Sequence, residues 1–567
     1  MYQNLLKTVT NLGSPTVLLV GDFMLDGYVY GDAPFGPELG IDLEDLERIE
    51  VVRGPGSALY GSHAALAVIN LVTRHPHSEP GASVTGRTGS WDERSVRAAY
   101  ASARPGRPEW WLSTSWLNAP GADHYFPVFD LETPPFGVAA GRDGERAASL
   151  FAGAEWNGFA IKAKWNERDK DLPTGVFGTV FADPRVFTRD SYSLIEASGL
   201  RRIANTVELN GRVYWDGTRY AATWVYDTDG APVVNMDHGY GDIVGGELQT
   251  HWAPVAAHVL TLGIEGREIL RAWQHNYDVS PRVVYVDTDA RGRSGAIYAQ
   301  DELQLAADVR VTGGARLDAA TKSVPVVSPR IDALWSSPWG TRWKVLAGSA
   351  FRAPSPYERL YDDGYTMVRN PDLKPERVTS FEASAEHHMG AATLTVAAYD
   401  NQVRDLIDQI DADTPGILIF ENRARVRSRG IEGEAQLAGP AGTRARMDVA
   451  CQRSEDSDTR LELTNSARWN AHLVLTRAPA ASRFSTGIGF RYLSSRLMQT
   501  GARTAAVGTA DARFGVRLGS ALTLAIEGRN LFDARFGDPG SDQLRPEQII
   551  QDGRTWNASL TLHAGPR

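Results

Sequence analysis

The stretch that decides the fold of this chain is Ile49-Glu-Val-Val-Arg-Gly-Pro-Gly-Ser-Ala-Leu-Tyr-Gly-Ser-His-Ala-Ala-Leu-Ala-Val-Ile-Asn-Leu-Val-Thr-Arg74. Residues 49–52 predict a short strand. The glycine–proline–glycine sequence at residues 54–56 predicts a tight turn, because proline fixes φ and glycine tolerates positive φ. A second apolar run at residues 68–72 predicts another strand. From the residues alone, this is a small buried sheet built around a glycine turn.

Three segments of this region form a longer motif: Leu46-Glu-Arg-Ile-Glu-Val-Val-Arg-Gly-Pro55, Ala58-Leu-Tyr-Gly61 and Val68-Ile-Asn-Leu-Val-Thr-Arg74. The motif resembles the end of the plug domain of TonB-dependent outer-membrane receptors. The resemblance implies that Arg53, Gly54, Pro55 and Gly61 belong to the plug motif of that family.

Length and composition set limits on the fold. The chain has 567 residues, so it holds either several domains or one very large barrel. No window of 18 apolar residues exists, which argues against a membrane-spanning helix, whereas a transmembrane strand needs only about ten alternating residues. The 15 Trp, 19 Tyr, 18 Phe and 55 Gly suit a barrel with aromatic girdles, and equally a soluble all-β protein. The net charge of −10 argues against nucleic acid as a partner, and the single cysteine excludes an internal disulfide framework.

The beginning of the chain differs in character from the plug-like region after it. Gly21-Asp-Phe-Met-Leu-Asp-Gly-Tyr-Val-Tyr-Gly-Asp32 resembles the start of a ribokinase-like heptose-phosphate kinase, which implies that Asp22 and Asp26 would lie near a sugar. No signal peptide and no TonB-binding box are evident. We therefore expect residues 1–33 to be a fused kinase-like fragment and residues 34–76 to be a C-terminal remnant of a plug domain. A chain of this kind is expected to leak small solutes and to lack energised uptake.

The pattern of polar and apolar residues changes from residue 77 onward. Segments of about ten residues alternate in polarity, as at residues 260–264, 393–397 and 522–526. Alternation with period two places one side toward lipid and the other toward the lumen. Residues 77–567 are long enough for about 22 strands, the number typical of plugged outer-membrane transporters. The predicted fold class is therefore all-β, a large transmembrane antiparallel β-barrel with a truncated plug domain inside.

Motifs in this region support the same family. Four of them resemble the receptor barrel and occur in the expected order: Tyr298-Ala-Gln-Asp-Glu302 with Gly314-Ala-Arg-Leu-Asp318; Ser328-Pro-Arg-Ile331; Phe351-Arg-Ala-Pro-Ser355 with Asn370-Pro-Asp-Leu-Lys-Pro-Glu376; and Glu421-Asn-Arg-Ala424 with Ser428-Arg-Gly-Ile-Glu-Gly-Glu434. Polar stretches at residues 119–145 and 272–292 are expected to be outer loops. The final strand is expected to turn toward lipid the side chains of Trp556, Ala558, Leu560 and Leu562.

Charged residues between plug and barrel are the candidate site. The receptors that this chain resembles pair plug arginines with barrel glutamates, which implies that Arg53 pairs with Glu382 or Glu432. A buried arginine can bind carboxylates bidentately and hold the plug in register. The alternative is that both glutamates line a wet lumen without a lasting partner. His75 and His77 are expected in a solvated turn rather than at a metal site.

The resemblance implies a receptor and transporter in the outer membrane of a Gram-negative-type bacterium, without enzymatic activity or a cofactor. Its expected partners are the TonB complex, a scarce ligand such as an iron-siderophore or cobalamin, outer-membrane lipids and the barrel-assembly machinery. Two alternatives stay open: a passive pore or inactive fusion product, and a soluble sugar kinase. The kinase alternative relies on Gly239-Tyr-Gly-Asp242 as an anion-binding turn, which should open a helix, but residues 243–252 alternate like a strand.

Overall fold

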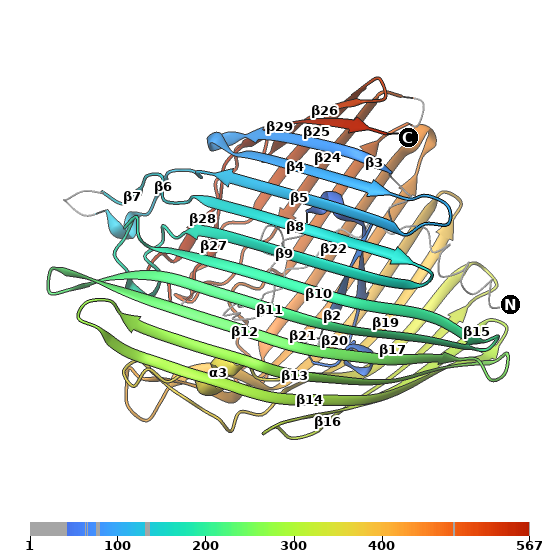
Figure 1. The fold of residues 1–567 in the computed structure, drawn as a ribbon, viewed down its shortest axis with the longest axis horizontal. Coiled ribbons are helices and arrows are strands. Elements are labelled where there is room, and N and C mark those ends of the chain that lie inside the picture. Colours follow the sequence, from blue (N-terminus) through green and yellow to red (C-terminus); the bar gives the residue numbers. More distant parts are fainter. Residues whose placement is uncertain are drawn as a thin grey trace.

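The chain folds as a closed antiparallel barrel around a small two-stranded sheet (Figure 1). The computed structural model describes residues 42–62, 64, 66–74, 80–130, 136–479, 482–541 and 543–565. The predicted kinase-like segment, residues 1–33, lies outside the described residues, as do His75 and His77. Among the described residues, no helix combines the length and the apolar composition that crossing a bilayer demands.

The barrel sheet contains 23 strands, of which β18 (Met367–Val368) pairs in parallel with β21. The other 22 are antiparallel, with β17 paired directly to β19. Their bounds are β3 (Gly81–Gly89), β4 (Arg94–Ser102), β5 (Glu109–Ala119), β8 (Glu145–Trp156), β9 (Phe159–Asp171), β10 (Phe187–Ala204), β11 (Val207–Thr228), β12 (Ala231–Trp252), β13 (His258–Asp278), β14 (Val283–Ala306), β15 (Val309–Ala320), β16 (Val326–Ser336), β17 (Thr341–Arg352), β19 (Glu376–Met389), β20 (Ala392–Asp411), β21 (Leu418–Ala438), β22 (Thr443–Asp456), β23 (Trp469–Arg477), β24 (Phe484–Leu493), β25 (Val507–Leu518), β26 (Leu522–Arg529) and β29 (Thr555–Ala564). The predictions of an all-β fold and of about 22 barrel strands are confirmed.

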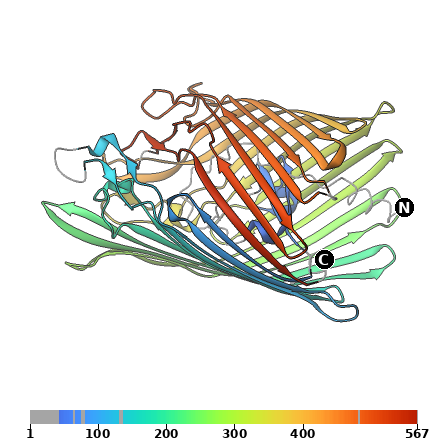
Figure 2. The ribbon, with the colours of Figure 1, turned by 90° about the horizontal axis from the view of Figure 1, so that it is seen from above.

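Residues 42–74, which we call the plug segment, lie inside the ring of strands (Figure 2). Their elements are η2 (Leu43–Asp45), β1 (Leu46–Arg53), α2 (Ser57–Tyr60) and β2 (Ala67–Thr73). Strands β1 and β2 form an antiparallel pair, and the predicted turn and short helix join them. The two strands expected from the sequence are therefore present.

The two ends of the barrel differ. Turns at one end are short, and β29 closes the ring there by pairing Ala564 with Ala82 of β3. At the other end, shown at the left of Figure 1, long connections carry small elements of their own. These are β6 (His124–Tyr125), η4 (Pro127–Phe129), β7 (Val138–Ala139), η5 (Val176–Gly178), α3 (Pro356–Leu360), β27 (Gly537–Pro539) and β28 (Gln548–Ile550). Two further elements lie in short turns: η3 (Ser90–Asp92) between β3 and β4, and η6 (Pro440–Gly442) between β21 and β22. Long loops on one side and short turns on the other are typical of outer-membrane barrels, whose long loops face outward.

Side-chain direction follows the predicted alternation in the last strand. Trp556, Leu560 and Leu562 are 51%, 41% and 52% exposed, because they point away from the lumen. The intervening residues of β29 are less exposed. The lipid-facing pattern expected from the sequence is confirmed.

Two expectations about chain segments have different outcomes. Residues 119–130 and 136–145 belong to the connection between β5 and β8, as expected for an outer loop. Residues 272–292 were expected to be a loop, and this is wrong. β13 extends to Asp278 and β14 begins at Val283, because the polar residues 272–278 and 283–292 continue the strand pairing and residues 279–282 form the turn. Gly239 and Asp242 lie within β12, so the helix that the kinase alternative requires is not formed there.

Candidate functional site

The turn after β1 docks on the lumen face of the barrel. Arg330 Nη1 on β16 donates to the Pro55 carbonyl oxygen at 3.1 Å, and the backbone N–H of Phe351 on β17 donates to Ser57 Oγ at 3.3 Å. Pro55 and Ser57 are fully buried. Gly54 has a φ of +79°, which glycine adopts without steric cost, so the chain can reverse direction directly after β1. This turn seats the plug segment on the wall through polar contacts.

Arg316 on β15 holds the other end of the same turn. Its Nη1 donates to the Leu59 carbonyl oxygen at 3.2 Å, while Nη2 pairs with Glu265 at 2.7 Å and Nε pairs with Asp318 at 2.9 Å. Only 3% of the Arg316 side chain is exposed. A Cβ at Gly61, whose φ is +73°, would come within 2.8 Å of Arg316 Nη2. Position 61 therefore requires glycine for both backbone conformation and space.

A separate cluster of charges holds the beginning of the plug segment. Arg97 on β4 pairs with Asp45, and its guanidinium also lies 3.5 Å from a Glu44 oxygen and 3.8 Å from an Asp42 oxygen. Arg87 on β3 pairs with the other Glu44 oxygen. Because the Arg97 and Asp45 side chains are each 9% exposed, water cannot easily replace either partner.

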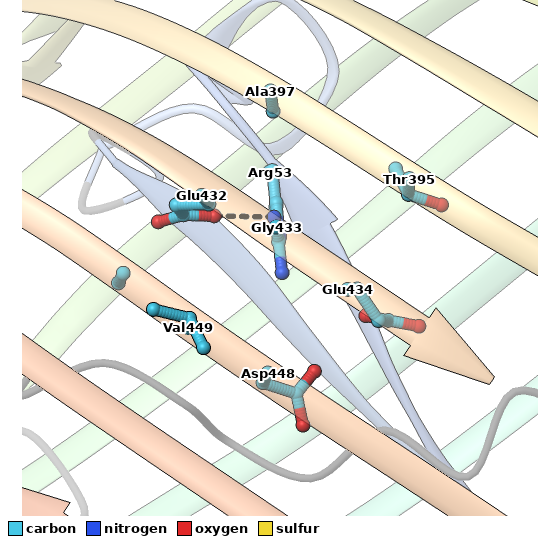
Figure 3. A pocket seen from close by; sticks show the side chains of 9 residues that line it. Arg53, Thr395, Ala397, Glu432, Gly433, Glu434, Asp448 and Val449 are labelled. Carbon is cyan, nitrogen blue, oxygen red and sulfur yellow. Dashed lines mark hydrogen bonds and ion pairs between the residues drawn. The ribbon is translucent and has the colours of Figure 1, made fainter.

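The predicted site residue Arg53 lies at the end of β1, where its Nη1 donates to Glu432 Oε2 on β21 (Figure 3). Glu382 on β19 lies nearby, since a Cβ built on Gly54 would be 3.5 Å from Glu382 Oε2. Among the described residues, the ion pair of Arg53 is with Glu432. The pocket around Arg53 is also lined by Glu434 and Asp448.

These contacts place the plug segment against three arcs of the wall: β3–β4, β15–β17 and β21. Each arc uses hydrogen bonds or ion pairs. Such contacts are individually weak when water can reach them and strong when it cannot. The arrangement can therefore hold the segment in register and still release it when the polar contacts break one after another.

The Arg53 contact leads to the first prediction. Replacing Arg53 by alanine should raise the rate of proteolysis in residues 42–74 by at most about fivefold, because a half-exposed ion pair contributes about 1 kcal/mol or less. The Arg53 side chain is 44% exposed. Limited proteolysis with mass spectrometry measures this rate. Exchanging the charges, with Arg53→Glu and Glu432→Arg together, should restore the original rate.

Arg48→Ala is the matched control, because Arg48 lies on the same strand and pairs with Glu47 and Glu50 of the plug segment itself. Equal cleavage of the Arg53→Ala protein and the unaltered chain would contradict a holding role for Arg53.

A second cluster of titratable groups contains residues of two outer loops. His124 Nε2 lies 3.0 Å from Asp143 Oδ2, and one ligand atom each of His124, Asp143 and Asp552 lie within 4.8 Å of one another. Lys170 Nζ donates to the Asp143 carbonyl oxygen at 2.8 Å and also to its carboxylate. One imidazole and two carboxylates could hold a metal, but Lys170 already neutralises Asp143. The geometry is that of a hydrogen-bonded clasp within the β5–β8 connection, with Asp552 of the β26–β29 loop beside it.

The clasp should depend on pH. The hydrogen bond to Asp143 raises the pKa of His124 above its ordinary value near 6.5. A raised pKa means that the stabilisation is complete below about pH 6.5 and is lost as the pH rises through the higher value. Hydrogen exchange of residues 136–145, corrected for intrinsic rates, should therefore be slower at pH 6 than at pH 8.5. His124→Gln should abolish this difference, and a difference that persists in His124→Gln would contradict the assignment.

Sequence reasoning identified Arg53 but missed the barrel arginines that hold the turn. Arg316 and Arg330 lie in two of the barrel motifs, yet the motifs give no indication of which side chains reach the lumen centre. Arg97 lies in no motif. The alternation of side chains along β4 could have predicted that Arg97 faces the lumen, but not that it lies beside Asp45.

Comparison with known proteins agrees with this arrangement. The family profile described as TonB dependent receptor-like, beta-barrel matches residues 88–531, and the profile of the TonB-dependent Receptor Plug Domain matches residues 21–68. The chain is 26% identical over 400 residues to the Vitamin B12 transporter BtuB of Vibrio vulnificus (strain CMCP6), which is 68% of this chain and 59% of that protein. It is 25% identical over 390 residues to the Iron-regulated outer membrane virulence protein of Vibrio cholerae serotype O1 (strain ATCC 39541 / Classical Ogawa 395 / O395), 65% of this chain and 54% of that protein. The chain thus spans less than two thirds of the length of these curated relatives.

Solved structures share the fold. The ferric yersiniabactin uptake receptor FyuA from Yersinia pestis superimposes with a TM-score of 0.75 at 15% identity, covering 92% of this chain and 86% of that one. A mutant of the ferric enterobactin receptor PfeA from Pseudomonas aeruginosa gives a TM-score of 0.75 at 16% identity, covering 93% and 86%. At these identities the likeness establishes the architecture alone.

Proposed function

Since this chain belongs to the TonB-dependent receptor family, we propose that it is an outer-membrane receptor that takes up a scarce ligand through a plug-gated barrel. The observation that carries the proposal is the plug segment, which polar contacts hold against three arcs of the lumen wall. A plug held in this way keeps its register under thermal motion, yet it can detach under a pull because its contacts with the wall can break one after another.

The proposed ligand is an iron-siderophore or a cobalamin-like molecule. The names of similar proteins support both, since one is a vitamin B12 transporter and another is a ferric yersiniabactin uptake receptor. The proposed partners are the TonB complex, which would supply the pull, the lipids of the outer membrane and the barrel-assembly machinery. The chain would therefore work in the outer membrane of a Gram-negative-type bacterium.

The proposed organisation assigns each part a role. Residues 34–76 act as the plug, with Arg53, Gly54, Pro55 and Gly61 as its docking motif, and residues 77–567 form the barrel. Glu432 would be the barrel partner of Arg53, with Glu382 as the adjacent carboxylate. Residues 1–33 are proposed to be a kinase-like segment fused to the front of this unit, while the match to the plug profile begins at residue 21.

Uptake measurements test the proposal and are the third prediction. The full chain, exported by an added signal peptide, is expressed in a Gram-negative host without its own siderophore and cobalamin receptors. One labelled ligand, a ferric siderophore or cobalamin, should enter with saturable kinetics, and an uncoupler or removal of TonB should stop its entry. Entry that is proportional to concentration and unaffected by the uncoupler would instead establish the passive pore, that is, the leak without energised uptake that the sequence alone led us to expect.

A further inference from the structure

Two neighbouring strands carry a continuous group of rings near the outer end of the barrel. The aromatic ladder, as we call it, consists of His238 and Tyr240 on β12 and Trp273, His275 and Tyr277 on β13. Ring centroids are 4.9 Å apart between Tyr240 and Trp273, 5.1 Å between Trp273 and His275, and 4.8 Å between His275 and Tyr277. Strand pairing sets Tyr240 opposite Trp273 and His238 opposite His275, so all five rings share one face.

This face is the outer surface of the barrel. Leu248 on β12 and Ile264 on β13 are paired, and both point outward, being 44% and 56% exposed. Alternation along β12 then places residues 240 and 238 on the outward face as well. On β13, Leu270 has no partner in the β12 register, and this extra residue moves the odd-numbered positions beyond it onto the outward face. The ladder therefore lies on the outward face, beyond the ion pair of Glu268 with Arg293 and closer to the outer end of the barrel.

Arginines surround the ladder. The Arg271 guanidinium lies 5.2 Å from the Tyr240 ring centre and 5.0 Å from that of Trp273, and Arg282 lies 4.2 Å from that of Tyr277. Neither arginine forms an ion pair in the part of the chain that the structure describes.

Further charged groups face the same surface, among them the pairs Arg293–Glu268 and Arg291–Asp289. Arg219 is neutralised by Asp242 at 2.8 Å. Asp287 accepts a hydrogen bond from Trp273 Nε1 at 2.9 Å and lies 3.7 Å from His275 Nδ1. Arg271 and Arg282 are therefore the arginines that contact the rings of the ladder and form no ion pair among the described residues.

We propose that the aromatic ladder, with Arg271 and Arg282, binds the phosphate-bearing headgroup of a lipid in the outer leaflet. Tryptophan and tyrosine prefer the boundary between hydrocarbon and headgroups, and the ladder follows the apolar and charged outward-facing residues toward the outer end of the barrel. Arginine binds phosphate through paired N–H donors, and the rings beneath hold each guanidinium in place. The inference rests on the membrane location of the barrel and not on the ligand that it transports.

Lipid binding to the purified full chain tests the proposal. The probe is a diphosphorylated glycolipid, compared with the same lipid after removal of its phosphates, and native mass spectrometry measures binding in detergent. The double variant Arg271→Ala/Arg282→Ala should bind the phosphorylated lipid about thirtyfold more weakly, since each arginine near an anionic headgroup contributes about fivefold. Binding of the dephosphorylated lipid should be unchanged.

The matched control is Arg189→Ala/Arg293→Ala, which removes two arginines that already pair with Asp169 and Glu268. This control should bind the phosphorylated lipid as the unaltered chain does. An equal loss in the control, equal affinity for both lipids, or no loss in the double variant would overturn the proposal. Displacement of the lipid by inorganic phosphate at the same concentration would also overturn it, because the site would then bind a free anion rather than a headgroup.

Discussion

Replacing Arg97 by alanine is expected to detach the beginning of the plug segment from the barrel wall and to raise the conductance of the lumen. The Arg97 and Asp45 side chains are each 9% exposed, so the variant leaves a carboxylate without its cation in a site that water hardly reaches. Breaking a buried pair by removing one partner costs about 3–5 kcal/mol. At about 1.4 kcal/mol per tenfold, the detached population should rise at least a hundredfold. Conductance in planar bilayers and proteolysis of residues 42–53 measure the two consequences.

The pH dependence of the Arg97→Ala variant shows whether its defect comes from the unpaired Asp45 carboxylate or from altered packing. Burial raises the pKa of the Asp45 carboxyl above its usual range even though Arg97 lowers it. Docking the plug segment with Asp45 ionised therefore costs free energy. Protonation of Asp45 removes this cost as the pH falls through the raised pKa. Without Arg97 the pKa should rise further, so the Arg97→Ala plug should dock again on acidification from pH 7.5 to pH 5.

Arg291→Ala serves as the control for this experiment, because the Arg291 side chain is 77% exposed and its ion pair among the described residues is a long one, 3.9 Å to Asp289. Its conductance should match that of the unaltered chain at both pH values. If the Arg97→Ala conductance were high and independent of pH, the defect would lie in packing rather than in the unpaired carboxylate.

The parts of the fold that sequence reasoning predicted are those with local signals. Apolar runs around a glycine turn give the plug hairpin, and period-two alternation gives the barrel strands and the lipid face of Trp556 and Leu560. These patterns depend on neighbours within ten residues, so the sequence contains them directly.

Features that depend on register could not be predicted in the same way. The stretch at residues 272–292 is polar, yet residues 272–278 and 283–292 pair as strands, because the backbone hydrogen bonds between neighbouring strands do not require apolar side chains. One unpaired residue, Leu270, decides which face carries Trp273 and His275. The pairing of Arg97 with Asp45 depends on how far the plug segment turns within the barrel, and no pattern along the chain encodes that angle.

The last prediction concerns the contact between the plug turn and the barrel wall, where Gly348 of the barrel lies against Pro55 of the plug segment. A Cβ at Gly348 on β17 would come within 2.8 Å of Pro55 Cγ, closer than two such carbons can approach. Gly348→Leu should therefore push the turn away from the wall and break the hydrogen bonds that Pro55 and Ser57 accept from Arg330 and the Phe351 backbone. Overpacking costs about 1–3 kcal/mol, and the lost hydrogen bonds add about 1 kcal/mol each.

The combined cost should make residues 54–62 cleavable at least a hundredfold faster than in the unaltered chain, as measured by limited proteolysis. Gly313→Leu is the matched control, because Gly313 lies on the nearby strand β15 and a Cβ there would meet nothing within 4 Å. Pro55→Ala removes the ring carbon that clashes, so Pro55→Ala/Gly348→Ala should dock better than Gly348→Ala alone. If the effects of Pro55→Ala and Gly348→Ala on the cleavage rate were simply additive, the plug turn would not pack against β17. The polar contacts of Arg316 and Arg330 would then have to hold the turn without that packing.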